Sequence, residues 1–446
     1  MEMEEREVRQ IVIIAGLQFG DEAKGATTDW AARFYNASLV VRYNGGPQNS
    51  HNVTLPNGRH HTFRQFGSAT FIPGVRTHLS EHVLINPVAM MLENLQLERV
   101  GVKDAFSRLT IDANAVVITP YQRAANILTE MARGQHAHGT CGVGLGQARA
   151  DSIKHSDYIL RAHHLKSKDE TMKRLKFIEE LHTPRISAAR HLIAHKTGER
   201  ASEDPVVKEA ISWFNGGDSR EYLWSQYENF PLHVILPNEK WTLRDILLRM
   251  DEIVIFEGSQ GVLLDEDNQD FYPHVTYTDT TYRNAIDLIG KATAGRSAAT
   301  IPTITAFGCL RPYATRHGAG PLPREDKSVN LTQDLREATK LTEHNEANRF
   351  QGSFRYAYLD LVWVKRAINY MGAFGGVDQI AMSCMDHLFH TEAGYFDLNG
   401  KFHESPSYNP SKQDEFADAI QKLIGVPISV LGYGPAYTHR FLRLTN

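Results

Sequence analysis

Cysteine is scarce in this chain, and long apolar runs are absent. Its 446 residues include three cysteines, Cys141, Cys309 and Cys384, which lie far apart. Such a small and scattered set predicts neither a disulfide framework nor a paired-cysteine zinc site, and it favours a reducing compartment. No apolar run approaches the ~18 residues of a membrane-spanning helix, and the acidic segment Met1–Glu5 has the wrong charge for a signal peptide. We therefore expect a cytoplasmic protein without a membrane partner.

The chain also lacks a strong net charge. Its formal charge is −4, and charged residues make up 22% of the sequence against 42% hydrophobic residues. A chain with so little net charge has no general attraction for nucleic acid, so we expect no nucleic-acid partner. The apolar share is that of an ordinary globular protein with a core. Local lysines and arginines can still bind small anions.

Apolar segments with the pattern of buried strands alternate with helical patterns along most of the chain. This alternation predicts an α/β fold with one large, mostly parallel sheet flanked by helices, as in P-loop NTPases. The stretch 157–249 has long helical patterns and few strand signals, so we predict a mainly helical insertion there. No segment has linker composition, and residues 1–446 are predicted to form a single domain. The predicted strands are Ile11–Ala15, Leu39–Arg42, Val83–Ile85, Val116–Thr119, Ile253–Phe256, Thr303–Leu310, Gln379–Met382 and Ile428–Gly432.

The turn Gly16–Gly25 is the most informative segment of the chain. It follows Ile11–Ile14, four β-branched residues that predict a strand buried on both faces. Glycines let the backbone approach a ligand closely, and a helix predicted from about Asp21 to Phe34 would aim its free N–H groups at an anion. The turn is not a Walker A loop, because Lys24 does not stand between a glycine and a serine or threonine. With an acid and a lysine inside it, the turn predicts a site for phosphate chemistry.

Four further segments could contribute to the same site. Arg42–Asn52 follows the second strand and carries His51, and in a doubly wound sheet it would share a crevice with the first turn. Gly139–Gly146 can wrap a phosphate with backbone N–H groups or serve as a flexible connection. Phe256–Asp265 ends another strand with a glutamine that can both donate to and accept from a base. Arg311–Pro321 has two arginines that could clamp an anion or pair with a neighbouring acid.

Together these segments resemble the signature motifs of the adenylosuccinate synthetases, which make adenylosuccinate from inosine monophosphate (IMP) and aspartate with cleavage of GTP. The similarity runs in the same order along nearly the whole chain. The family's Gly-x-Gln-Trp-Gly-Asp-Glu-Gly-Lys-Gly signature is present as Gly16–Gly25, with Phe19 for tryptophan and Ala23 for glycine. Four other family motifs are matched: Gly-Gly-x-Asn-Ala-Gly-His by Gly45–His51, Gly-Thr-Thr-Gly-x-Gly-x-Gly-Pro by Gly139–Gln147, Glu-Gly-x-Gln-Gly-x-x-Leu-Asp by Glu257–Asp265, and Thr-Arg-Val-Gly-Ala-Gly-Pro-x-Pro by Thr315–Pro323.

The resemblance implies a ligase mechanism, in which the purine 6-oxygen is first phosphorylated and then displaced by the amine of aspartate. Asp21 matches the family's base for the N1 proton of the purine. His51 matches the group that hydrogen-bonds the transferred phosphate, and Lys24 would neutralise phosphate oxygens. A carboxylate oxygen of Asp21 and the backbone carbonyl of Ser50 match the ligands of Mg²⁺.

The resemblance also implies ligand contacts and an assembly. L-Aspartate is the expected amino acid, and the family's arginine-rich amino-acid loop is reduced here to Arg349 and Arg355. A homodimer is expected, in which a residue near Lys154–His155, or Arg149, reaches the partner's nucleotide. The expected contacts are Gln48, Asn49, Thr140, Cys141, Gln260 and Thr276 for the purine mononucleotide, and Gly20, Glu22, Lys24, Gly25, Ser50, His51, Asp386, Gly432 and Gly434 for the nucleoside triphosphate.

Several motif positions depart from the family pattern. Losing one arginine contact to aspartate would cost about 1.5–3 kcal/mol, enough to redirect the choice of amino acid. Cys141 replaces a threonine of the phosphate loop, and Gln48 replaces an asparagine near the purine. The family's guanine-reading Thr-Lys-Leu-Asp is present as Ser383–Asp386, which keeps the aspartate but lacks the stacking lysine. GTP is therefore the first expected phosphate donor, with ATP or dATP as alternatives.

The acceptor purine has two candidates. Leu431–Pro435 resembles the phage branch that makes 2-aminoadenylosuccinate from dGMP, but that branch replaces the catalytic aspartate with serine, whereas Asp21 is retained here. We therefore expect IMP first and (d)GMP second. A further hypothesis is a nucleotide-binding homologue with a different amino-acid substrate or no ligase activity, and the retention of Asp21, Lys24 and His51 argues against it.

Overall fold

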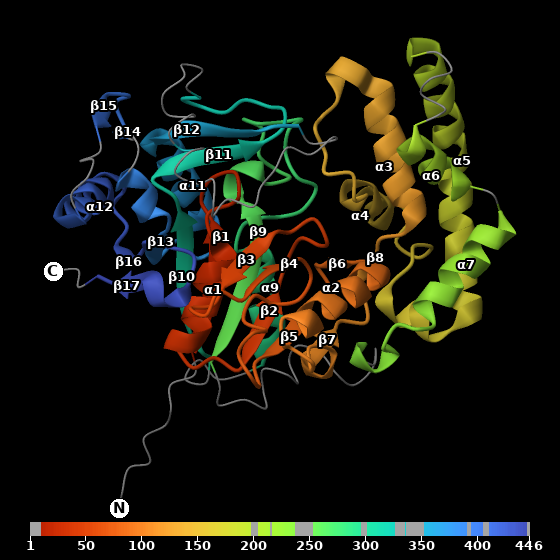
Figure 1. Ribbon diagram of the computed structural model, residues 1–446, viewed down its shortest axis with the longest axis horizontal. Coiled ribbons are helices and arrows are strands. Elements are labelled where there is room, and N and C mark those ends of the chain that lie inside the picture. Colours follow the sequence, from red (N-terminus) through yellow and green to blue (C-terminus); the bar gives the residue numbers. More distant parts are fainter. Residues whose placement is uncertain are drawn as a thin grey trace, which may run out of the picture.

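A large twisted sheet lies at the centre of the molecule (Figure 1). The computed structural model describes residues 10–443 apart from 198–203, 215, 237–252, 296–300, 326–334, 336–351, 390–393 and 405–409. Within these residues the sheet has nine strands: β1 (Gln10–Gly16), β2 (Leu39–Arg42), β5 (Arg76–Leu79), β7 (Leu109–Ile111), β9 (Val254–Gly261), β10 (Thr303–Leu310), β13 (Gln379–Met382), β16 (Ile428–Gly432) and β17 (Arg440–Leu442). Their order is β17-β16-β13-β10-β1-β9-β2-β5-β7, and every neighbouring pair is parallel except β16 and β17.

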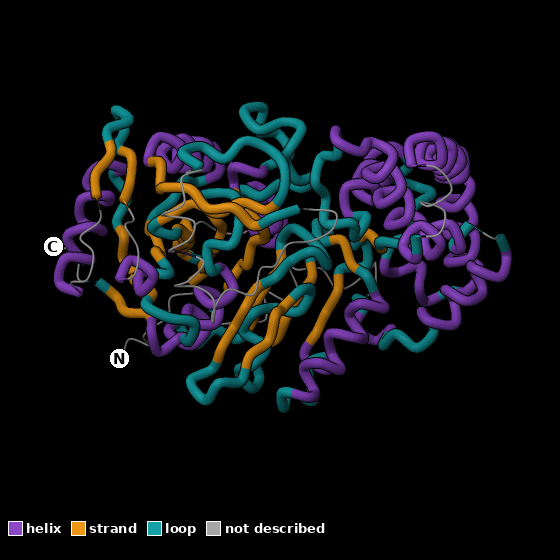
Figure 2. Tube along the Cα trace, turned by 45° about the horizontal axis from the view of Figure 1, so that its top comes forward, coloured by secondary structure: helices purple, strands orange, loops and turns teal. Residues whose placement is uncertain are grey.

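Helices cover both faces of this sheet and form a separate group beside it. The helices on the sheet are α1 (Lys24–Phe34), α2 (Pro87–Arg99), α9 (Arg283–Thr293), α11 (Leu361–Met371) and α12 (Pro410–Ile424). The group beside it contains α3 (Pro120–Arg133), α4 (Leu145–Lys154), α5 (Lys168–Thr197), α6 (Pro205–Ser212) and α7 (Gly217–Tyr227). Figure 2 shows this group in purple on one side of the sheet. The predicted mostly parallel α/β fold is confirmed.

The central strands are buried on both faces because alternate side chains enter different parts of the core. Ile11 and Ile13 of β1 belong to the cluster that includes residues of α9, α11 and α12. Val12 and Ile14 belong to a second cluster, with Trp30 of α1. An almost continuous apolar run is therefore what this strand position requires.

Side-chain caps fix where several helices begin. Asn86 accepts a hydrogen bond from the backbone N of Ala89 at the start of α2, and Pro87 takes the first helical position. Asp360 accepts from the backbone N of Val362 at the start of α11. These caps satisfy backbone donors that the helix itself cannot pair.

The helical group has its own core, which spans the predicted boundary at residue 157. Buried Ala125 and Leu128 of α3 pack with Ile186 and Ile193 of α5 and with Val207 of α6. Helices α3 and α4 thus lie before residue 157 but belong spatially with the helices after it. Residues 237–252 of the predicted insertion lie outside the described residues.

Three smaller sheets accompany the central one among the described residues. All eight predicted strand segments contain a strand, but Val83–Ile85 and Val116–Thr119 form only a two-stranded sheet of their own. Strands β5 and β7 of the central sheet were not predicted. The smaller sheets are β3 (His51–Thr54) with β4 (His60–Phe63), β6 (Leu84–Ile85) with β8 (Val116–Val117), and β11 (Tyr313–His317) with β12 (Phe354–Asp360), β14 (Gly394–Phe396) and β15 (Phe402–Glu404).

The prediction that the first helix begins near Asp21 was wrong by one turn. Asp21 and Ala23 have φ angles of 61° and 58°, in the left-handed region, and α1 begins only at Lys24. Asp21 and Ala23 therefore belong to the turn that joins β1 to α1. In the described parts of the chain, no helix is long and apolar enough to cross a membrane.

Candidate active site

Most of the sequence motifs converge on one edge of the central sheet. In spatial order, β16, β13, β10, β1, β9 and β2 are neighbouring parallel strands. Gly16–Gly25 follows β1, Asn44–Ser50 follows β2, Arg311 follows β10, Ser383–Asp386 follows β13, and Gly432–Gly434 ends β16. Because parallel strands end at the same edge, these loops surround one crevice, which is where doubly wound folds bind ligands.

Glu22 organises the first turn from inside. Its buried carboxylate accepts hydrogen bonds from the backbone N of Gln18 at 3.1 Å and of Gly20 at 2.8 Å, and from Nζ of Lys24 at 2.9 Å. A side chain at Gly16 would collide with the same carboxylate. Glu22 therefore shapes the turn and holds Lys24, and any contact it makes with a triphosphate would have to involve its backbone.

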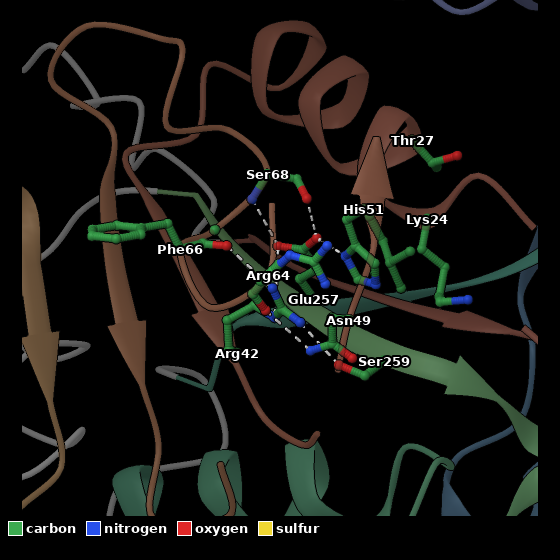
Figure 3. A network of polar contacts seen from close by, with 12 residues as sticks. Lys24, Thr27, Arg42, Asn49, His51, Arg64, Phe66, Ser68, Glu257 and Ser259 are labelled. Atoms are coloured by element: carbon green, nitrogen blue, oxygen red, sulfur yellow. Dashed lines mark hydrogen bonds and ion pairs between the residues drawn. The ribbon is translucent and has the colours of Figure 1, made fainter. Parts of the chain in front are cut away.

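His51 is held by a buried polar network beneath this turn (Figure 3). Its Nδ1 lies 2.5 Å from Oε1 of Glu257 on β9. Glu257 also accepts hydrogen bonds from the hydroxyl and, at 3.0 Å, the backbone N of Ser68, and Nε of Arg42 lies 3.9 Å from its Oε2. Arg42 in turn donates to Oγ of Ser259 at 2.9 Å. Because all these side chains are buried, the imidazole ring has a fixed orientation.

The contacts within this network set the protonation states of Glu257 and His51. Burial would raise the pKa of Glu257, but the attraction of Arg42 and His51 outweighs it and lowers that pKa to about 2. Burial lowers the pKa of His51 to about 4, although Glu257 opposes the shift. At neutral pH the carboxylate is therefore ionised and the imidazole is neutral. Since a carboxylate can only accept, the proton of the ring lies on Nδ1, and Nε2 is an acceptor.

Two adjoining cavities open at this edge. The smaller, of about 420 Å³, is lined by Asp21, Lys24 and His51, with Asp386 also on its wall. The larger, of about 610 Å³, extends to helices α3, α4 and α5 and is lined by Thr140 among others. The residues that line both cavities are Gln48, Cys141, Gln260, Leu264, Arg316 and His317.

Most of the predicted site residues line at least one of these cavities. Glu22, Gly432 and Arg355 do not, although Gly432 lies against Ser383 at the same edge. The predicted site residues that line a cavity are Gly20, Asp21, Lys24, Gly25, Gln48, Asn49, Ser50, His51, Thr140, Cys141, Gln260, Thr276, Asp386 and Gly434.

Several cavity-lining side chains carry polar atoms that no other described residue pairs with. Both amide atoms of Gln48 and Oε1 of Gln260 are buried without a hydrogen-bond partner, as is Oδ1 of Asp386. Leaving such atoms unpaired is costly, so they indicate groups that a ligand satisfies. Gln260 also has a φ of 61°, a strained backbone of the kind that accumulates at functional sites.

Comparisons with known proteins agree with this geometry. The family model for adenylosuccinate synthetase matches residues 13–393. The chain is 30% identical over 463 residues to an adenylosuccinate synthetase of Rhodococcus erythropolis, covering 97% of this chain and 98% of the relative. The chain belongs to the adenylosuccinate synthetase family. It is therefore a ligase that forms a carbon–nitrogen bond.

Solved structures share the fold at lower identity. Fully ligated adenylosuccinate synthetase from Plasmodium falciparum aligns with a TM-score of 0.70 and 19% identity, covering 97% of this chain and 99% of that one. The succinoaminodeoxyadenylate synthetase of cyanophage S-2L, bound to dGMP and dATP as an energy donor, aligns with a TM-score of 0.62 and 17% identity, covering 98% of this chain and 96% of that one.

Two residues at this site, Glu257 and His317, were not predicted from the sequence, and a third, Arg311, was expected only as a clamp for an anion or a partner of an acid. Glu257 fixes His51, Arg311 lines the smaller cavity, and Nε2 of His317 lies 3.3 Å from Oδ2 of Asp21. Signals for two of them were present: Glu257 opens a matched family motif, and His317 stands where the motif of the synthetases has valine. Asp21 and His51 line the same cavity, but the histidine that contacts the Asp21 carboxylate is His317.

Only part of the expected amino-acid loop lies within the described residues. Arg349 lies outside the described residues. Arg355 is on β12, where its guanidinium donates to Oε2 of Glu325 at 2.7 Å and to the carbonyl of Gly320 at 2.6 Å. Neither of the two cavities in the described part of the chain has Arg355 in its wall. A carboxylate ligand would have to compete with Glu325 for this arginine.

The donors at the smaller cavity fit the Mg²⁺ that the family uses. The Asp21 side chain is 18% exposed and lines the same cavity as Ser50, so a carboxylate and a backbone carbonyl are available at one place. Magnesium prefers hard oxygen ligands and usually takes only one or two from protein, leaving the rest to water and substrate phosphates. The residues present meet that requirement.

Proposed function

We propose that this ligase uses GTP to phosphorylate the 6-oxygen of IMP and then joins aspartate at C6 to give adenylosuccinate. The observation that carries the proposal is the convergence of Asp21, Lys24 and His51 on one cavity that shares a wall with a second. A triphosphate in the smaller cavity and a purine mononucleotide in the larger would meet at that wall. The unpaired amide of Gln48 and the unpaired Oε1 of Gln260 lie there and could bind a purine or its ribose phosphate.

In this proposal Asp21 removes the N1 proton of the purine, which turns the 6-oxygen into a nucleophile. Burial would raise the pKa of Asp21, but the neighbouring His317 and the cations Arg311 and Lys24 hold it well below its usual value. The carboxylate is therefore ionised when the purine arrives. The 6-oxygen attacks the γ-phosphorus, and GDP leaves. The aspartate amine then attacks C6, the C6–O bond breaks, and phosphate departs while the amine loses a proton.

His51 would stabilise the phosphoryl group during both steps. Its Nε2 is an acceptor while the ring is neutral, so this nitrogen must gain a proton before it can donate to a phosphate oxygen. An incoming phosphoryl dianion favours that proton, as does the Glu257 carboxylate 2.5 Å from Nδ1. Lys24, held by Glu22, would neutralise further phosphate charge. Magnesium, held by Asp21 and the Ser50 carbonyl, would supply charge for the triphosphate oxygens.

Guanine recognition would fall to Asp386. Its Oδ1 is buried without a partner among the described residues and can accept from the N1 and N2 hydrogens of guanine, which adenine lacks. This favours GTP over ATP or dATP as phosphate donor.

Aspartate binding and the assembly are proposed from the family alone. Arg349 and Arg355 remain the candidates for the aspartate carboxylates. In a homodimer, Lys154 and His155 at the end of α4, which line the larger cavity, or Arg149, would contribute near the nucleotide phosphate.

A second candidate acceptor is (d)GMP. It is favoured by the fold shared with the phage enzyme that was solved with dGMP and dATP. IMP remains the first candidate because Asp21 is retained where the phage branch has serine.

The test is an assay of purified protein with Mg²⁺ and aspartate, with IMP or dGMP as acceptor and GTP, ATP or dATP as donor. Phosphate release and product mass are followed, and Asp21→Asn is the inactive control. The proposal expects adenylosuccinate from IMP and GTP. A product from dGMP alone would establish the second candidate, and no phosphate release with any purine would refute both.

A further inference from the structure

His317 reaches the site from a sheet other than the one that carries the motifs around Asp21. It is the last residue of β11 and pairs with Phe354 of β12 in the four-stranded sheet. Its ring lies against the ring of Phe354, with centroids 4.7 Å apart. The side chain is 19% exposed and lines both cavities. His317 therefore lies where the smaller and the larger cavity meet.

The contact between His317 and Asp21 has the geometry of a hydrogen bond to a carboxylate. Nε2 lies 3.3 Å from Oδ2 of Asp21, and no other described side chain forms an ion pair with that carboxylate. Because a carboxylate only accepts, Nε2 must carry a hydrogen in this arrangement. Asp21 itself has a φ of 61°, so its backbone is held in a conformation that few side chains adopt. A carboxylate on such a turn can still rotate about its Cβ–Cγ bond unless a partner fixes its plane.

We propose that His317 is a positioning residue, which donates from Nε2 to Oδ2 of Asp21 and so turns the other carboxylate oxygen toward the N1 proton of the purine. The inference rests on the proposed function. A carboxylate has about four acceptor sites, so this bond leaves sites for a purine proton and for magnesium. Valine, which the family motif has at this position, could fill the space but could not donate.

Phosphate release with the acceptor purine tests the proposal through three variants. His317→Val should lower kcat by ~10–100-fold, as loss of a bond that orients a reacting group does, while KM for the purine changes far less. His317→Gln places an N–H at a similar reach and should recover most of kcat. Phe354→Leu removes the ring that supports His317 but leaves the donor, so it serves as the matched packing control and should keep most of the activity.

A nitrogen-15 NMR spectrum of histidine-labelled protein adds a readout that needs no catalysis. The His317 resonance, assigned by its absence in His317→Gln, should show a proton on Nε2, and Asp21→Asn should shift it. A resonance that Asp21→Asn does not move would overturn the proposal even if the protein showed no ligase activity. In an active protein, the proposal would also fall if His317→Val kept full kcat, or if the valine, glutamine and Phe354→Leu variants lost kcat equally.

Discussion

Replacing Glu257 by glutamine should destabilise the protein and slow its reaction together. The carboxylate is fully buried, accepts from His51 and Ser68, and faces the equally buried guanidinium of Arg42. Glutamine has almost the same shape, so packing is kept while the charge and one acceptor are lost. The substitution therefore probes electrostatics and hydrogen bonding instead of volume.

The expected loss of stability in Glu257→Gln follows from the distance between Arg42 and Glu257. With 3.9 Å between Nε of Arg42 and Oε2 of Glu257, the attraction is about 4 kcal/mol at an effective dielectric constant of ~20. Breaking one partner of a buried ion pair typically costs ~3–5 kcal/mol, because the other charge stays buried. Wherever the amide nitrogen is placed, it faces another donor, either at Ser68 or at His51. We therefore expect the free energy of unfolding to fall by about 4 kcal/mol, and kcat to fall by ~10²–10³ because His51 loses its orienting acceptor.

Urea unfolding at pH 7 and steady-state phosphate release measure the two effects. Glu179→Gln is the matched control, because Glu179 is also a buried acid that accepts from a backbone N, that of Gly216 at 3.0 Å, and pairs with an arginine, Arg220. It lies on α5 and lines neither cavity, so its variant should lose stability with kcat unchanged. A Glu257→Gln protein that unfolds at the wild-type urea concentration, or turns over at the wild-type rate, would refute the reasoning.

Three further outcomes are expected. Ala23→Gly should be neutral or stabilise the fold by up to about 1 kcal/mol in urea unfolding, because φ of 58° strains alanine but not glycine; a clear loss would contradict this. Gly25→Ala should abolish phosphate release, since its Cβ would lie 2.7 Å from Cβ of His51, whereas Gly290→Ala, which meets nothing within 4 Å, should be fully active. Burial lowers the pKa of His78 to about 3 from 6.5, so the unfolded chain binds the proton first, and the stability that neutral His78 contributes above pH 6.5 is lost as pH falls toward 3. Between pH 7 and pH 4, the free energy of unfolding of His78→Asn should therefore fall by about 3 kcal/mol less than that of the wild type, as measured by urea unfolding. If the free energy of unfolding changed with pH equally in the two proteins, this prediction would be wrong.

The fold could be predicted where the signal is local. The β-branched run Ile11–Ile14 and similar runs mark strands buried on both faces, and the glycine-rich loops that follow them mark the ligand edge. Strand β5 was missed because its buried residues include Thr77 and His78, whose polarity hides the strand. Thr77 accepts from the backbone N of Gly67, and His78 bonds to Thr110 of β7, and only the folded chain brings these partners together.

The candidate site was predictable to the level of loops but not of contacts. His51 of β3 and Glu257 of β9 are 206 residues apart in sequence and belong to different sheets, so only the folded chain brings them together. His317 reaches Asp21 from β11, which belongs to the four-stranded sheet, whereas Asp21 follows β1 of the central sheet. The pairing of Arg355 with Glu325 likewise depends on the isolated bridge between Glu325 and Ala357 of β12, which no local sequence pattern encodes.

The common wall of the two cavities means that their ligands cannot bind independently. Gln48 and Gln260 face both spaces, and each amide can adopt only one orientation at a time. A ligand that fixes these amides in one cavity spares the second ligand the entropy of ordering them, or opposes it if the required orientations differ. Thermodynamic reciprocity then requires that each nucleotide change the affinity of the other by the same factor. Binding in one cavity of this ligase is therefore coupled to binding in the other, through the few side chains that lie between the two cavities.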